Sequence, residues 1–260
     1  MTHTQDPGKG HEVVGSVIYG PVRSRRYGNS LGINLSPMGK KVCTFNCVYC
    51  QLGWGDEKKT CGRDDFLSSD VLLGEISQGL FKHLSENDAE VDNIVVSGNG
   101  EPTLHPDFAL LTHHLIHCAK KNKARMPVIC FTNGSTLSDD RVFDALQMFD
   151  ECCVKLDAAT SKIDLPNAAF NLDAARARMA ALDHLVIQSC FVEGVLSNTH
   201  ADEVGAWVDS LEWLSPKRID IYTISRNTPH NGLTAVAPDA LSRIANHLSE
   251  RGYKSVRVCI

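Results

Sequence analysis

The sequence predicts an α/β fold in which parallel strands alternate with helices, either as an open array or as a barrel. Short runs rich in β-branched residues end in Gly, Asn or Asp, and longer stretches with a helical hydrophobic period lie between them. The spacing of these runs suits one strand, one helix and two loops per unit, which is typical of βα repeats around a parallel sheet. In such sheets chemistry gathers at the carboxyl ends of the strands.

Six strands are predicted in chain order. They cover residues 92–97, 127–132, 151–157, 185–192, 218–224 and 253–259. Helical patterns cover residues 70–83, 106–121, 138–148, 172–182, 200–214 and 238–251. We expect Ser138 and Asp239 to act as N-terminal caps or first-turn acids, and Pro106 and Pro238 to occupy first helical turns.

Length and composition favour one large globular domain. The chain has 260 residues, of which 43% are hydrophobic and 22% charged, and these values are ordinary for a folded domain. We expect residues 1–12 to form a flexible leader and residues 13–260 to form a single domain. Because no apolar run is long enough for a membrane helix and the polar start lacks the apolar core of a secretory signal, we expect a cytoplasmic protein with no membrane partner.

Three of the ten cysteines lie close together in the chain, as Cys43, Cys47 and Cys50 in the pattern C-x3-C-x2-C. Reduced thiols that bind metal fit this pattern better than a disulfide scaffold does in so long a chain. Three cysteines on a [4Fe-4S] cluster leave one iron open to a small molecule. Two alternatives stay open, namely a zinc site completed by a distant His or Cys and a fully ligated iron-sulfur centre that only transfers electrons.

The triplet, with Tyr49 before its last cysteine, resembles the signature of the radical S-adenosylmethionine (SAM) superfamily. Residues 20–32 resemble the lead-in of the branch that contains the wybutosine (tRNA wyosine) biosynthesis iron-sulfur proteins. The resemblance implies a partial (β/α)6 barrel with parallel strands and outer helices, and a [4Fe-4S] cluster on the three cysteines. It also implies that an external flavodoxin- or ferredoxin-like protein supplies an electron, so that SAM is cleaved to methionine and a 5′-deoxyadenosyl radical that abstracts hydrogen from a substrate.

Further motifs at the ends of predicted strands resemble the SAM-binding positions of the superfamily. Residues 97–104 read SGNGEPTL and resemble the GGEP motif that binds the SAM amino group, with Asn99 in place of the second glycine. Residues 132–134 and Asp157 resemble positions that bind the ribose and the carboxylate of SAM. The resemblance therefore implies cofactor contacts from Tyr49, beside the adenine, and from Gly98, Gly100, Glu101, Thr132, Asn133 and Asp157.

Five side chains are predicted as substrate contacts. Arg25, Arg26 and Arg226 are suited to a phosphate or a carboxylate. Gln188 lies in an otherwise apolar strand, so a polar barrel interior suits its amide better than a dry core, and strand alternation puts Cys190 on the same face. The substrate stays open among an RNA base, a protein or peptide, and a small metabolite. The net charge of −5 argues against RNA because nucleic-acid binders usually carry a broad basic field, whereas the lead-in argues for it.

Overall fold

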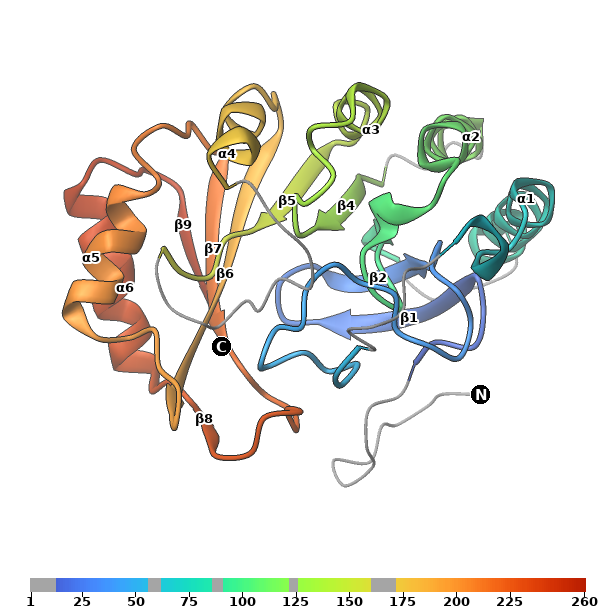
Figure 1. The fold of residues 1–260 in the computed structure, drawn as a ribbon. Helices are drawn as coiled ribbons and strands as arrows, with labels where there is room; N and C mark the ends of the chain where they lie inside the picture. The colour runs from blue at the N-terminus through green and yellow to red at the C-terminus, as the bar shows by residue number, and fades with distance from the viewer. Residues whose placement is uncertain (1–12, 56–61, 86–90, 122–125, 160–171) are drawn as a thin grey trace.

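The computed structural model describes residues 13–55, 62–85, 91–121, 126–159 and 172–260. The predicted leader lies outside this set. The described chain contains one nine-stranded sheet. The sheet is curled, and the helices lie in an arc along its outer side (Figure 1). This arrangement confirms the predicted α/β class, a partial barrel of parallel strands with outer helices.

The order of the strands across the sheet follows the chain. The strands are β1 (Ile18–Ser24), β2 (Gly28–Ile33), β3 (Asn93–Val96), β4 (Val128–Thr132), β5 (Glu151–Lys155), β6 (Leu185–Gly194), β7 (Arg218–Thr223), β8 (Leu233–Ala235) and β9 (Val256–Cys259). Neighbours from β2 to β7 and on to β9 are parallel. The exceptions are β1, antiparallel to β2, and β8, antiparallel to β6. The six predicted strands therefore correspond to β3 to β7 and β9.

The helices also follow the predicted order, with shifted ends. They are α1 (Ser69–Ser85), α2 (Phe108–Lys121), α3 (Asp140–Leu146), α4 (Leu172–Ala180), α5 (Ala201–Asp209) and α6 (Pro238–Glu250), with short 3-10 helices at η1 (Arg63–Asp65) and η2 (Pro102–Leu104). Pro238 and Asp239 lie in the first turn of α6, as predicted. The prediction for Ser138 was wrong, because Asp139 caps α3 and its carboxylate accepts a hydrogen bond from the backbone N–H of Arg141 at 2.9 Å. Pro106 precedes α2 instead of opening it.

Two strands that the sequence analysis missed position the cysteine triplet. β1 has the sequence IYGPVRS and is largely exposed, so it lacks the period-2 alternation by which a half-buried strand is recognised. β2 pairs in parallel with β3. The triplet therefore follows the carboxyl end of a parallel strand, like the other motifs.

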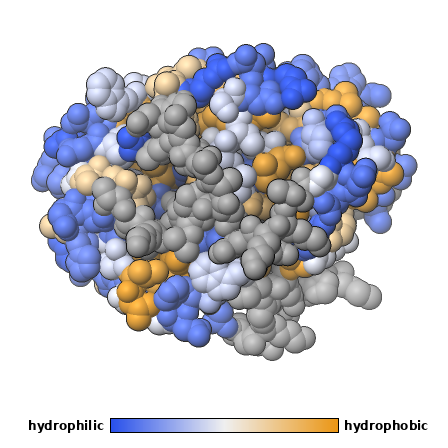
Figure 2. Space-filling view, viewed as in Figure 1, coloured by the Kyte–Doolittle hydropathy of each residue, from blue (hydrophilic) through white to orange (hydrophobic). Residues whose placement is uncertain are grey.

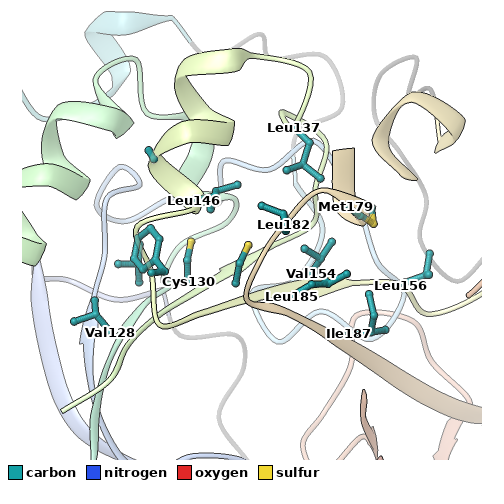
Figure 3. Close-up of a cluster of buried hydrophobic side chains, with 14 of the residues drawn as sticks. Val128, Cys130, Leu137, Leu146, Val154, Leu156, Met179, Leu182, Leu185 and Ile187 are labelled. Carbon is teal, nitrogen blue, oxygen red and sulfur yellow. The ribbon is translucent and has the colours of Figure 1, made fainter. Parts of the chain in front are cut away.

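The larger hydrophobic core lies between the outer face of the sheet and the helices. Figure 3 shows Cys130, Val154 and Ile187 of the sheet beside Leu146 and Met179. Each buried leucine or isoleucine side chain stabilises the fold by about 1.5–3 kcal/mol. The inner face carries a smaller cluster, made of Val95, Ile129, Cys153 and Val186 with the rings of Tyr27 and Phe131.

The turn between β1 and β2 reaches under the amino ends of the central strands. The Tyr27 hydroxyl donates a hydrogen bond to Glu151 at 2.9 Å and accepts one from Arg218 at 2.7 Å. Glu151 begins β5 and Arg218 begins β7. We call the group Tyr27, Glu151, Arg218, Asp220 and Arg257 the floor, because it lies at the amino end of the half-barrel.

The visible surface is mixed in polarity. In Figure 2 hydrophilic residues make up most of the periphery of the face shown, and hydrophobic residues are scattered among them. Among the residues that the structure describes, no helix has both the length and the apolar character needed to cross a membrane.

Candidate functional site

The loop that carries the cysteine triplet is hydrogen-bonded to the loop that carries Glu101. Val42 forms a parallel bridge with Gly100. The Val42 N–H donates to the carbonyl of Asn99 at 2.8 Å, and the Val42 carbonyl accepts from the N–H of Glu101 at 2.9 Å. Cys43 follows Val42 directly, so the first thiol is held next to Glu101 although the two residues lie far apart in the sequence.

The thiols of the triplet differ from the other described cysteines in exposure. Cys43, Cys47 and Cys50 are partly exposed. Six others are buried, namely Cys118, Cys130, Cys152, Cys153, Cys190 and Cys259. Isolated buried cysteines act as small apolar side chains, whereas the triplet residues stand in a loop that solvent reaches in part.

The local electrostatics of Cys43 favour a bound cation. Burial of the sulfur and the negative charge of Glu101 raise the pKa of the Cys43 thiol to about 12. A thiol with such a pKa stays protonated at neutral pH unless a metal displaces the proton. The Cys43 sulfur also accepts contacts from the Asn133 side-chain amide at 3.5 Å and the Phe45 N–H at 3.4 Å. Hydrogen bonds to sulfur are typical of ligated iron-sulfur thiolates.

A single-ion site is not formed by these side chains. Within the described ranges, no three Cys, His, Asp or Glu side chains are placed to hold one metal ion. The three thiolates could instead each bind a different iron of one [4Fe-4S] cluster.

Glu101 is buried and accepts hydrogen bonds from uncharged donors. The donors are the hydroxyls of Thr103 at 2.6 Å and Thr132 at 2.8 Å, with the backbone N–H groups of Asn133 at 2.7 Å and Thr103 at 3.2 Å. Burial raises the pKa of Glu101, and these hydrogen bonds oppose the rise only in part. The described residues form no ion pair with Glu101. Its carboxylate is therefore suited to a ligand ammonium group.

Glycines and an asparagine shape the loop that presents Glu101. Gly98 and Gly100 have φ values of 150° and 138°, which L side chains rarely adopt. A Cβ at Gly100 would also collide with the carbonyl of Val42. Asn99, at the position where the superfamily motif has glycine, is fully buried. Its amide accepts from Val14 N–H at 2.6 Å and donates to the carbonyls of Val14 at 2.8 Å and Pro37 at 3.0 Å, so it fastens the N-terminal segment to this loop.

Asp157 is the second buried carboxylate at this end of the half-barrel. It accepts hydrogen bonds from the Tyr49 hydroxyl, from Lys155 Nζ at 2.7 Å and from the Cys190 N–H at 2.5 Å. The Asp157 carbonyl accepts from the Asn198 amide at 2.8 Å. The structure thus brings together Tyr49, which precedes Cys50, and Asp157, which follows β5.

Lys155 is a charged inner-face residue that the sequence analysis missed. Its ammonium group donates to the Tyr222 hydroxyl at 2.6 Å as well as to Asp157. Burial alone would lower the pKa of Lys155, but the charge of Asp157 and the contact with Tyr222 outweigh it and raise that pKa. Lys155 ends β5 and stands two residues before Asp157, a spacing that puts two side chains on the same side of an extended chain, and this was a signal that could have found it.

The predicted substrate contacts divide into two groups. Gln188 and Cys190 are buried on the inner face of β6, and the guanidinium of Arg26 lies over the inner-face rings of Phe131 and Tyr222. The other two are exposed: Arg25 donates to the Thr223 carbonyl at 2.9 Å, and Arg226 donates to the Gln51 amide at 3.0 Å beside the triplet loop. The structure therefore does not bring Arg25 and Arg226 to the inner-face group.

Comparisons with known proteins agree with this geometry. Residues 40–169 match the model of the Radical SAM superfamily. A Brachyspira hyodysenteriae protein named GTPase Obg is 28% identical over 87% of this chain and 32% of its own length. A UPF0026 protein of Helicobacter pylori is 30% identical over 81% of this chain and 67% of its own length. The structure of a radical SAM methyltransferase from Sphaerobacter thermophilus is similar with a TM-score of 0.60 at 16% identity, over 89% of this chain and 67% of that one.

The chain thus spans 32% of the first of these relatives and 67% of the second. The likeness to the solved structure supports the fold, and the match over residues 40–169 includes the triplet, Glu101 and Asp157. The chain belongs to the radical SAM superfamily, whose members are enzymes that use a [4Fe-4S] cluster and SAM.

Proposed function

We propose that this protein binds a [4Fe-4S] cluster through Cys43, Cys47 and Cys50 and cleaves SAM reductively to start a hydrogen abstraction. The observation that carries the proposal is the pair of hydrogen bonds through Val42 that holds the triplet loop against the Glu101 loop. When bound, the cofactors supply one-electron reduction of the sulfonium by an external flavodoxin- or ferredoxin-like donor, breakage of the C5′–S bond to methionine and a 5′-deoxyadenosyl radical, and hydrogen-atom transfer from the substrate to that radical.

The protein's own residues would bind and orient SAM. Glu101 would accept hydrogen bonds from the ammonium group, since its present donors are all neutral. Asn133 lies between Glu101 and Cys43, so it would orient the amino-acid end of SAM near the cluster. Tyr49 and Asp157, which are hydrogen-bonded to each other, would contact the adenosine end. The burial of both carboxylates supports exclusion of water from the reactive centre.

The branch and the substrate are part of the proposal. The resemblance of residues 20–32 to the wyosine lead-in supports an RNA base as the substrate. A protein or peptide and a small metabolite are the other candidates. Residues 20–32 form most of the β1–β2 hairpin, so the segment that carries the resemblance is also the one whose Arg26 reaches the inner face of the sheet.

Anaerobic reconstitution of single-cysteine variants tests the proposal. Replacement of Cys43, Cys47 or Cys50 by Ala should remove iron, sulfide and the brown absorbance, and with them the formation of 5′-deoxyadenosine from SAM. Cys118→Ala is the matched control, because Cys118 is buried on α2 away from the triplet, and it should keep the cluster. A brown, active Cys47→Ala protein would contradict the proposal.

The two alternatives have separate signatures. Zinc in place of iron in protein prepared without oxygen would favour the zinc site. A cluster whose magnetic resonance spectrum does not change on addition of SAM would favour a fully ligated electron carrier, because such a cluster has no open iron.

A further inference from the structure

Among the residues that the structure describes, one positively charged side chain in the half-barrel, Arg26, has no negatively charged partner. The guanidinium of Arg26 lies 4.1 Å from the centre of the Tyr222 ring and 5.4 Å from that of Phe131. Its Nη1 atom is buried and has no hydrogen-bond partner within the described part of the chain. The described residues also provide no carboxylate in ion-pair contact with Arg26.

A second buried donor without an acceptor among the described residues, the side-chain amide of Gln188, lies on the inner face of the sheet. Gln188 is 1% exposed, and its Nε2 atom is buried with no acceptor among the described residues. The register pairs Cys190 with Tyr222, and Cys190 lies two residues beyond Gln188 on the inner face. Tyr222, whose ring lies under the Arg26 guanidinium, is therefore on the strand next to β6, which carries the Gln188 amide. Buried N–H groups without acceptors are uncommon in folded proteins and ask for an explanation.

The neighbouring charges already balance one another. Lys155 is paired with Asp157 at 2.7 Å. On the floor, Arg218 is paired with Glu151 at 2.7 Å, and Arg257 with Asp220 at 2.7 Å. These groups leave no negative charge for Arg26. A buried cation without a counterion is costly. Burial acts to lower the pKa of Arg26, but its contacts with Tyr222 and the nearby thiols outweigh burial and raise that pKa, so the side chain stays charged and can attract an anion.

We propose that Arg26 and Gln188 bind a carboxylate group of the substrate inside the half-barrel. This inference rests on the proposed function, and among its candidate substrates it favours a protein, a peptide or a small metabolite that bears a carboxylate over an RNA base, because the standard bases carry no carboxyl group. One unbalanced positive charge matches the single charge of a carboxylate, whereas a phosphate dianion would leave excess negative charge. Two N–H donors also match the two oxygens of a carboxylate.

The position of this carboxylate suits hydrogen abstraction from the same molecule. Lys155 contacts the Tyr222 ring at 4.7 Å and binds Asp157, the residue that we assign to the adenosine end of SAM. A carboxylate on Arg26 would therefore lie one aromatic ring away from the group that contacts SAM. The floor beneath, where Tyr27 binds Glu151 and Arg218, would keep the carboxylate from passing further toward the amino ends of the strands.

The test measures melting of the anaerobic, SAM-loaded holoenzyme with acetate as the probe. At matched ionic strength acetate should raise the melting temperature above that in chloride, whereas neutral acetamide should not, because a ligand that binds only the folded state stabilises it. Arg26→Met should require about tenfold more acetate for the same rise, if it responds at all. Arg23→Met is the matched control, because Arg23 is exposed on the same hairpin, and it should respond like the wild type.

A second readout separates binding from a structural role of Arg26. Without acetate, Arg26→Met should melt no lower than the wild type, since the variant removes an unpaired buried charge. A variant that melts lower and still responds to acetate would overturn the proposal. If Arg26→Met does not fold, Gln188→Leu decides, because it should weaken the acetate response about threefold through the loss of one donor.

Three other results would overturn the inference. They are an absent response of the wild type to acetate, an equal response to acetamide, and a larger response to phosphate than to acetate. Failure of the proposed function is distinguishable from these, because it would appear as a wild-type protein that binds no cluster or forms no 5′-deoxyadenosine, whatever its response to acetate.

Discussion

At the floor of the half-barrel, Glu151 and Asp220 accept hydrogen bonds from guanidinium groups. At the opposite end, the donors to Glu101 among the described residues are hydroxyl and backbone N–H groups. Arg218 contacts both floor carboxylates at 2.7 Å, and Arg257 adds a second contact to Asp220. Burial acts to raise the pKa of Glu151, but the hydrogen bonds from Arg218 and Tyr27 outweigh it and lower that pKa. For Glu101 the balance is reversed, and its pKa is raised.

The difference separates a structural network from a binding site. The floor is electrostatically complete, so it stabilises the fold without a ligand. Glu101 keeps a buried negative charge that neutral donors stabilise only in part, and a cationic ligand would complete it. The two arginines differ in the same way. Arg218 is paired with carboxylates, whereas the described residues provide no carboxylate for Arg26, so an anionic ligand would complete its site.

The largest expected effect follows from breaking the floor. Arg218→Met would leave the partly buried Glu151 with only the more distant ammonium group of Lys217, at 3.9 Å, as a cationic partner. It would also remove one of the two guanidinium partners of Asp220. We expect the free energy of unfolding to fall by about 3 kcal/mol, since the side chains of Arg218, Glu151 and Asp220 are 16%, 13% and 0% exposed and removal of one member of such a pair strands a charge. Urea unfolding of the reconstituted protein measures the change.

The double variant Arg218→Met/Glu151→Leu is the control for this interpretation. Removal of the stranded carboxylate should restore part of the lost stability. A loss below about 1 kcal/mol in the single variant, or no recovery in the double variant, would show that the floor is a weak surface-like network.

Replacement of one carboxylate at each end sharpens the comparison. Glu101→Gln should weaken SAM binding by about ten- to a hundredfold, because hydrogen bonds to a charged group are worth about 1.5–3 kcal/mol. It should not lower the melting temperature of the SAM-free protein, since a buried charge is removed. Glu151→Gln should do the reverse, with lower stability and unchanged SAM affinity. Anaerobic equilibrium dialysis and thermal melting measure the two quantities, and equal SAM affinity of Glu101→Gln and wild type would remove Glu101 from the binding site.

The sequence predicts more of the site at the carboxyl end of the half-barrel than of the floor at its amino end. Cys43, Glu101 and Asp157 stand in short local motifs at strand ends, so a resemblance finds each of them within a few residues. Parallel βα order then places them at one edge of the sheet without any knowledge of side-chain contacts. The periodicity likewise predicts β3 to β7 and β9, and of these β3 to β6 are largely buried on both faces.

The floor has no such signal. Tyr27 lies in a turn between β1 and β2, whose polar residues and glycines hide the usual strand pattern. Its partners Glu151 and Arg218 follow more than a hundred residues later in the sequence. A charged residue at a strand start is most often solvated, so its pairing depends on tertiary structure alone. Arg26 was expected in a basic run that contacts substrate, but only the fold separates it from the exposed Arg25.

The smallest expected effect is a pH dependence that should appear at only one end. Burial raises the pKa of Glu101, so a fall in pH through that raised value protonates the carboxylate and removes the charge that would bind the SAM ammonium. SAM affinity should therefore fall as the pH falls, by less than the loss in Glu101→Gln because protonation is partial.

The stability of the SAM-free protein should depend on pH in the opposite direction. The contribution of Glu101 to the free energy of unfolding is fully present below its unfolded pKa and is lost as pH rises through its folded pKa. Glu151, with its lowered pKa, stays charged over this range. SAM dissociation constants of wild type and Glu101→Gln, measured from neutral pH down through the raised pKa of Glu101, check the prediction. If the dissociation constants of both proteins change equally with pH, another group causes the pH dependence.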